Sequence, residues 1–272
     1  LMQEMRRGGY EFYTGTSYRH LLIHKFGSVV ELTAPHDILT KRIGEYLPQD
    51  AVLREMMETS YRILSNHPLN LERKAKGLNP ANSVWFWGAG TRPMLTSFEE
   101  KYHKKGAMIS AVDLLKGIAV GAGLDNIIVE GANGGLHTNY TGKAEAAVDA
   151  LAAQDYDFVY VHIEAPDEMG HQGSIPDKIK AIENIDQKII GPIVGELEDL
   201  CMDFRTLVLP DHPTPICVRT HTGNPVPYLL YDSRKKAEGM PEYSERLGNK
   251  SPLFEKEGHR LLSRLFEMDN ER

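Results

Sequence analysis

Cysteine is scarce in this sequence: 272 residues contain Cys201 and Cys217, and these two do not form a CxxC pair. A disulfide framework like that of small secreted proteins is therefore excluded, and a reducing, cytoplasmic compartment is predicted. No apolar run approaches the roughly 18–20 residues of a membrane-spanning helix, so no membrane partner is expected. A Walker-type GxxxxGK(S/T) loop and the protein-kinase signature set are also missing, which disfavours a kinase.

Positive charge is in the minority as well. Lys and Arg total 31 against 38 Asp and Glu, which gives a formal net charge of −7. Because no stripe of basic residues is interleaved with aromatics, no nucleic-acid partner is predicted. A small anionic ligand is compatible with this balance, since local basic residues decide its binding. A chain of this length can bury a full core, as one large domain or as two smaller ones.

Residues 1–80 are predicted to form a small α+β unit. The expected elements are strands at 11–13 and 18–24, a helix capped by Asp37 that runs to residue 47, and a helix at 52–64.

From residue 83 onward, short apolar runs alternate with amphipathic helical patterns. Strands are expected at 83–87, 107–109, 126–130, 158–163, 205–209 and 227–231. Helices are expected at 111–120 after Ser110, at 141–152 capped by Thr141, from 174 past 190 with a kink at Gly191-Pro192, and at 253–266. Repeated βα units predict an α/β fold, three layers deep, around a mainly parallel sheet.

Carboxylates and imidazoles follow the late strands of this sheet in Asp167-x-x-Gly-His171, Asp211-His212 and the loop residue His221. Because ligands collect beyond the carboxyl ends of parallel strands, these loops are expected to meet at one edge. Gly170 is expected to let the first loop bend tightly. Carboxylate and imidazole together suit Mn²⁺ or Zn²⁺ better than Mg²⁺ or Ca²⁺. Two such ions about 3.5–4 Å apart can clamp both oxygens of a phosphoryl transfer.

The same residues carry a resemblance to a known family. Asp167-x-x-Gly-His171, Asp211-His212 and His221-Thr-x-Asn-Pro-Val-Pro227 resemble the alkaline-phosphatase superfamily, and within it the archaeal-type branch of the cofactor-independent phosphoglycerate mutases. The likeness spans nearly the whole chain and includes the strings Ser17-Tyr-Arg-His-Leu-Leu22, Asn79-Pro-x-Asn82 and Trp85-x-Trp-Gly88. It implies that residues 81–272 form the C-terminal part of the metal-binding core. Residues 1–80 would form part of an inserted α+β cap, or lid, domain.

The resemblance implies a metal-dependent mutase that interconverts 3-phosphoglycerate and 2-phosphoglycerate through a phosphoserine. Asp167, His171 and His221 would ligate one divalent ion, and Asp211 and His212 would contribute to a second. Mn²⁺ or Zn²⁺ is favoured over Mg²⁺. The expected partner is a small phosphorylated substrate, and homo-oligomer formation is left open.

The nucleophile of the family, a Ser or Thr near the N-terminus, is not found in this sequence. Ser17, Thr138 and Thr141 are candidates by residue type alone, and each is expected to have a local role in a turn or cap. We expect the nucleophile upstream of Leu1, and we expect the 272-residue chain alone to be inactive as a mutase.

Basic residues outside the metal cluster are candidates for substrate binding. Arg19, His20 and Arg92 could each recognise phosphate or carboxylate, and Lys105 is a weaker candidate. Arg19 and His20 are equally well interpreted as an exposed surface pair.

The remaining candidates near the site are assigned supporting roles. His162 is expected to be a hydrogen-bonded core residue, Glu164 to accept a hydrogen bond from a metal-bound histidine, and Asn133-Gly-Gly135 and His137 to lie in a turn and a loop. Two other functions stay open. One is a metal-dependent phosphohydrolase or other phosphotransferase on the same core, and the other is a non-catalytic metal-binding protein.

Overall fold

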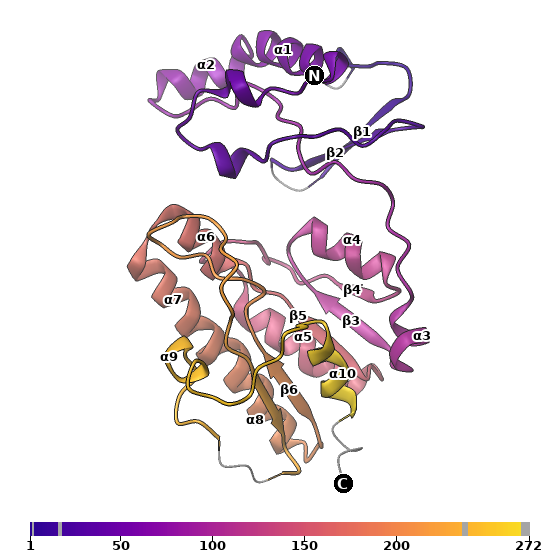
Figure 1. The fold of residues 1–272 in the computed structure, drawn as a ribbon, viewed down its shortest axis with the longest axis vertical. Helices are drawn as coiled ribbons and strands as arrows, with labels where there is room; N and C mark the ends of the chain where they lie inside the picture. The colour runs from indigo at the N-terminus through magenta and orange to yellow at the C-terminus, as the bar shows by residue number, and fades with distance from the viewer. Residues whose placement is uncertain (2, 16–17, 236–238, 268–272) are drawn as a thin grey trace. The chain divides into compact units, whose positions relative to one another are not determined.

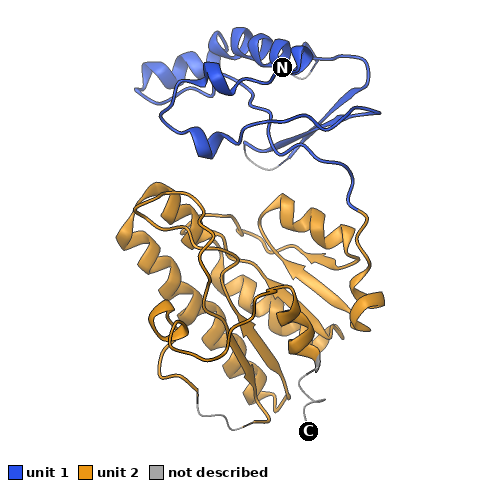
Figure 2. Ribbon diagram, in the orientation of Figure 1, with its two compact units in different colours: residues 1–93 blue, residues 94–272 orange. Residues whose placement is uncertain are grey.

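The computed structural model describes residues 1, 3–15, 18–235 and 239–267 (Figure 1). The chain divides into two compact units, Leu1–Pro93 (unit 1) and Met94–Arg272 (unit 2), shown in blue and orange in Figure 2. Within the described ranges, no helix is both long enough and apolar enough to cross a membrane.

Unit 1 combines a β-hairpin with short helices, as the α+β prediction requires. Its elements are β1 (Tyr10–Thr14), β2 (His20–His24), the 3₁₀ helices η1 (Pro35–Ile38) and η2 (Ile43–Tyr46), α1 (Ala51–Ser65) and α2 (Pro68–Ala75). The strands pair antiparallel, with Tyr10 opposite His24. Asp50 caps α1, because its carboxylate accepts hydrogen bonds from the backbone N–H groups of Val52 and Leu53.

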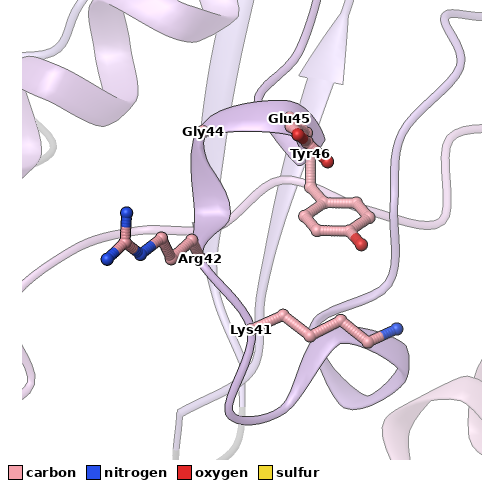
Figure 3. A pocket seen from close by; sticks show the side chains of 5 residues that line it. All are labelled: Lys41, Arg42, Gly44, Glu45 and Tyr46. Atoms are coloured by element: carbon pink, nitrogen blue, oxygen red, sulfur yellow. The ribbon is translucent and has the colours of Figure 1, made fainter.

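Two of the predicted elements in unit 1 are wrong. The helix expected from Asp37 to residue 47 is broken into η1 and η2, because Thr40 between them has a φ of 68°. Lys41, Arg42, Gly44, Glu45 and Tyr46 line an open pocket there, in which Lys41 and Tyr46 extend on the same side and Arg42 points away (Figure 3).

The strand expected at 83–87 is not a strand. Two of its donors bond outside a strand ladder: the N–H of Val84 donates to Ser60 Oγ at 2.9 Å, and Trp85 Nε1 donates to the carbonyl of Thr33 at 2.8 Å.

Unit 2 has the α/β alternation that its sequence predicts. Its strands are β3 (Gly106–Ile109), β4 (Asp125–Ile127), β5 (Phe158–Val161), β6 (Arg205–Val208) and β7 (Leu229–Asp232). Its helices are α3 (Phe98–Tyr102), α4 (Asp113–Gly121), α5 (Tyr140–Ala153), α6 (Ala165–Gln172), α7 (Ile175–Ile185), the π-helical turn η3 (Asp186–Ile190), α8 (Gly191–Asp199), α9 (Glu245–Gly248) and α10 (Arg260–Glu267).

The sheet confirms the prediction of an α/β fold around parallel strands. β3 lies between β4 and β5 and is parallel to both, with Ile109 opposite Val161. β6 and β7 form a separate antiparallel pair, with Val208 opposite Leu229. A parallel pairing requires a long crossover, usually a helix, and no helix lies between β6 and β7 in the described chain.

Several helix ends differ from the prediction. Asn139 rather than Thr141 caps α5, because Asn139 Oδ1 accepts from the N–H of Gly142 at 2.9 Å. α4 has no side-chain cap, and Ser110 instead accepts from the N–H of Val112. The last helix begins at Arg260 rather than at residue 253.

The helix after Ser174 continues past Gly191-Pro192 into α8. Directly before Gly191 it passes through η3, where the N–H of Gly191 donates to the carbonyl of Asp186. A π turn therefore takes the place of the expected kink. The core of unit 2 lies where α5, α6 and this helix meet. Its buried members are Tyr140, Ala144, Ala165, Met169, Ala181 and Ile189.

Candidate metal centre

Asp167 and His171 lie on helix α6, not in the loop that the sequence predicted. Pro166 stands in the first turn of α6, directly after β5, where its fixed φ suits a helix start. Gly173 ends the helix with a φ of 74°. Four residues apart on a helix, the two side chains share one face, and His171 Nε2 lies 3.3 Å from Asp167 Oδ2.

Gly170 does not make the bend that was expected of it, because it lies inside α6. A Cβ atom added there would lie 2.5 Å from the carbonyl oxygen of Thr214, closer than real Cβ contacts come. Glycine is therefore required so that the loop carrying Thr214 can lie directly against the helix.

The loop between β6 and β7 brings His221 to this helix face. His221 Nε2 is 3.2 Å from His171 Nε2 and 3.4 Å from Asp167 Oδ1. One carboxylate oxygen and two imidazole nitrogens thus lie within 4.8 Å of one another. Such a set suits a divalent ion of the Mn²⁺ or Zn²⁺ type, so the residues present fit a metal.

Asp211 and His212, just after β6, lie beside this group. The rings of His212 and His221 have centroids 3.8 Å apart. Asp211 Oδ2 lies 3.2 Å from His212 Nε2, and its Oδ1 accepts from the backbone N–H of His212 at 3.0 Å. The five side chains singled out in the sequence therefore form one cluster, with Asp211 at its more exposed end.

The orientation of His171 is set by a backbone carbonyl. Its Nδ1 lies 2.9 Å from the carbonyl oxygen of Arg219, which can only accept a hydrogen bond. Nδ1 therefore carries the proton, and the lone pair of Nε2 faces Asp167 and His221.

Glu164, the residue expected to accept a hydrogen bond from a metal-bound histidine, lies against the turn at 133–135, and its expected role stays a prediction. A Cβ atom at Gly134 would lie 2.1 Å from Glu164 Oε2, so the 133–135 turn approaches this carboxylate closely. That turn is as expected: the N–H of Gly135 donates to Asn133 Oδ1 at 2.9 Å.

A buried lysine that the sequence did not reveal bonds to the chain between β5 and α6. Lys143 on α5 is 1% exposed, and its Nζ donates to the carbonyl of His162 at 3.0 Å. Burial lowers the pKa of Lys143 to about 8, against the opposing effect of the Glu164 carboxylate. A lysine on a helix is usually solvated, so the sequence pattern alone did not single it out.

His162 is hydrogen-bonded as expected, but it is half-buried and not part of the core. Its Nδ1 lies 3.2 Å from Ser110 Oγ. Burial, and then the charge of Lys143, lower the pKa of His162, while Asp211 and Asp167 act in the opposite direction. A neutral imidazole at neutral pH is therefore expected beside the two aspartates.

The residues predicted to bind substrate, Arg19, His20 and Arg92, belong to unit 1. Arg19 Nη2 donates to the hydroxyl of Tyr18 at 3.1 Å, and His20 Nδ1 accepts from the N–H of Gly15 at 3.3 Å. Arg92 is exposed. Their assignment to substrate stays a prediction.

Lys105, the weaker candidate, does not lie near the metal cluster. It precedes β3 at the amino end of the parallel sheet, where its N–H donates to Asp157 Oδ2.

The hydroxyl candidates for a nucleophile have local roles where they are described. Thr138 is buried and accepts from the N–H of Asn133, Thr141 is an exposed residue of α5, and His137 lies in the neighbouring loop. Ser17 lies outside the described residues.

Comparison with known proteins assigns the chain to a family. Residues 21–261 match the metalloenzyme superfamily. The chain therefore belongs to the metalloenzyme superfamily.

The relatives within it carry a more specific name. The chain is 50% identical over 247 residues to the 2,3-bisphosphoglycerate-independent phosphoglycerate mutase of Methanosarcina barkeri, a match that covers 88% of this chain and 62% of that protein. A probable mutase of the same name from Geobacter sulfurreducens is 44% identical, with coverages of 95% and 65%. The chain thus spans less than two thirds of the length of these curated relatives.

Two solved structures are similar to this chain in both sequence and fold. The cofactor-independent phosphoglycerate mutase of Thermoplasma acidophilum is 25% identical, with a TM-score of 0.53, and the match covers 97% of this chain and 66% of that one. A Pyrococcus horikoshii protein is 34% identical, with a TM-score of 0.66 and coverages of 81% and 57%. The likeness to cofactor-independent phosphoglycerate mutases, expected from the motifs, is confirmed.

Proposed function

We propose that this chain forms the metal-binding part of a phosphoglycerate mutase that interconverts 3-phosphoglycerate and 2-phosphoglycerate. The observation that carries the proposal is the convergence of Asp167, His171 and His221, with ligand atoms within 4.8 Å of one another. The names of the relatives support the substrate. The scarcity of cysteine supports a cytoplasmic location.

The proposed site takes two divalent ions, Mn²⁺ or Zn²⁺ ahead of Mg²⁺. Asp167, His171 and His221 would hold one, and Asp211 and His212 would contribute to the other. Held there, the ions would neutralise negative charge on the oxygens of a transferred phosphoryl group. The carbonyl of Arg219 keeps the Nε2 lone pair of His171 turned toward that position.

The substrate would be recognised by Arg19, His20 and Arg92, whose donors suit phosphate and carboxylate. The phosphoryl group would pass from one hydroxyl of glycerate to a serine and from that serine to the other hydroxyl. Water must be kept away during the exchange, or phosphate is lost by hydrolysis. Unit 1 is the proposed lid.

Metal binding tests the site directly on the 272-residue chain. We expect isothermal titration calorimetry to detect Mn²⁺ binding that His171→Ala weakens at least 100-fold, because one of three clustered donors is lost. His137→Ala, at a loop histidine outside the cluster, is the matched control and is expected to bind as the original chain does. Equal binding by all three proteins would rule out the proposed site.

The reaction is tested by a chimera in which this chain replaces the matching region of the Methanosarcina barkeri protein. With Mn²⁺ and 3-phosphoglycerate, ³¹P NMR is expected to show 2-phosphoglycerate forming, and this signal is expected to be absent in the His171→Ala chimera. The 272-residue chain alone is expected to form no 2-phosphoglycerate from 3-phosphoglycerate. Release of inorganic phosphate without isomer exchange would favour a phosphohydrolase instead.

A further inference from the structure

Thr214 is a buried hydroxyl between the two halves of the metal cluster, and it is 4% exposed. Its Oγ1 donates a hydrogen bond to Asp167 Oδ1 and lies 3.4 Å from His212 Nδ1. Asp167 belongs to the group with His171 and His221, whereas His212 is paired with Asp211. A single side chain therefore contacts both groups.

The single proton of the Thr214 hydroxyl determines how it bonds to its two neighbours. A threonine hydroxyl has one proton, and here the carboxylate of Asp167 receives it. Toward His212, the same oxygen can then only accept, and it lies 3.4 Å from Nδ1. The other ring nitrogen of His212, Nε2, faces Asp211 Oδ2 at 3.2 Å. The proton of the Thr214 hydroxyl is therefore committed to Asp167.

The backbone holds Thr214 in place without help from its hydroxyl. Lys178 Nζ on α7 donates to the carbonyl of Thr214 at 2.6 Å, and that carbonyl lies directly over Gly170. Pro213 and Pro215 on either side restrict the chain further. Removing the hydroxyl alone should therefore leave the loop where it is.

We propose that Thr214 is a positioning residue of the metal centre, which holds the carboxylate of Asp167 in place beside His212. This inference rests on the proposed function, because it assigns both residues to metals. Thr214 is not the nucleophile: its hydroxyl is buried and its proton is already donated to Asp167. It does for the carboxylate of Asp167 what the carbonyl of Arg219 does for the ring of His171.

The test compares Thr214→Val, which keeps the shape and removes the hydroxyl, with Thr214→Ser, which keeps the hydroxyl. By calorimetry on the 272-residue chain, the valine variant is expected to bind Mn²⁺ about 10–100-fold more weakly. The serine variant is expected within about threefold of the original chain. Melting temperatures of the metal-free proteins are expected to stay close, which separates positioning from folding.

A second readout needs no metal. In ¹³C NMR of the metal-free chain, the carboxyl signal of Asp167 is expected to shift in the valine variant and to stay in place in the serine variant. Unchanged Mn²⁺ affinity or an unchanged Asp167 signal in the valine variant would overturn the inference. An original chain that binds no Mn²⁺ but shows this shift would overturn the proposed function and leave the link between Thr214 and Asp167 intact.

Discussion

The two segments that meet at the metal cluster are built in different ways. Helix α6 holds Asp167 and His171 on a regular backbone, with the N–H of Asp167 already bonded to the carbonyl of Glu164 at 3.0 Å. The β6–β7 loop holds Asp211, His212 and His221 on irregular chain, with few internal backbone bonds, such as that from the N–H of Thr222 to the carbonyl of Pro213.

This difference means that the loop takes its geometry from the helices. Three hydrogen bonds tie the loop to these helices. The hydroxyl of Thr214 donates to Asp167, the carbonyl of Thr214 accepts from Lys178, and the carbonyl of Arg219 accepts from His171. α6 and α7 pack against each other (Figure 1) and provide one surface for these bonds. Changes at this surface should therefore disturb metal binding even where they leave the loop residues themselves unaltered.

The largest effect is expected from Gly170→Ala. Alanine normally stabilises a helix interior by about 1 kcal/mol relative to glycine. Here the new Cβ would lie 2.5 Å from the carbonyl of Thr214 and force the loop away. We expect the free energy of unfolding to fall by about 3 kcal/mol, near the upper range for overpacking, and Mn²⁺ affinity to fall with it.

Gly195→Ala is the matched control, because Gly195 lies inside α8 and a Cβ atom added there would meet nothing within 4 Å. Urea unfolding is expected to show stabilisation of about 1 kcal/mol for this variant. If both substitutions stabilise the protein, the loop does not depend on contact with α6.

A smaller effect is expected from Lys143, which supports the end of β5 from which α6 starts. Its folded-state pKa of about 8 lies below the ordinary value of 10.5, so between these values the unfolded chain binds one more proton. The free energy of unfolding therefore rises with pH in this window, and from pH 8 to 9.5 the increment is about 1–2 kcal/mol.

Lys143→Met should remove this increment, whereas Lys180→Met, at an exposed position of α7, should leave it unchanged. Urea unfolding at pH 8 and pH 9.5 measures both. If the free energy of unfolding of the original chain and of Lys143→Met changed equally with pH, folding would not lower the pKa of Lys143.

The smallest effect is expected from Arg219→Gly. Arg219 has a φ of 57°, which glycine adopts freely, and the carbonyl that orients His171 is retained. The guanidinium, which lies against Gly173, is lost. We expect stability to change by less than about 1 kcal/mol and Mn²⁺ affinity by less than threefold. A tenfold loss would assign the role to the side chain instead of the carbonyl.

Much of unit 2 could be predicted from its sequence because apolar runs and helix signals agreed locally. The continuous apolar stretch at 158–163 became β5, and residues placed after β5 and β6 were expected at one edge. The helix beginning at Ala165 was missed although Pro166 is a helix-start signal, because a functional motif there was interpreted as a loop.

Other features depend on tertiary contacts that a single sequence does not contain. Nothing in the pattern around Lys143 distinguishes it from a solvated lysine, and Gly170 has meaning only beside Thr214. The 83–87 segment has strand-like residues, yet two of its donors bond to Ser60 and Thr33 of unit 1 and not to a neighbouring strand.

The π turn η3 keeps a long apolar row in line. Side chains at every fourth position of this helix are buried or half-buried: Ala181, Ile185, Ile189, Ile193 and Leu197. In an uninterrupted α-helix, each step of four residues overshoots a full turn by about 40°, so the row would rotate by about 160°. The one extra residue in η3 takes back about 100° of that rotation. Deleting Gln187 would therefore turn η3 into a regular α-helical turn and keep Ile193 and Leu197 in line, whereas winding η3 as an α-helix without a deletion would swing them out of the core by about 100°.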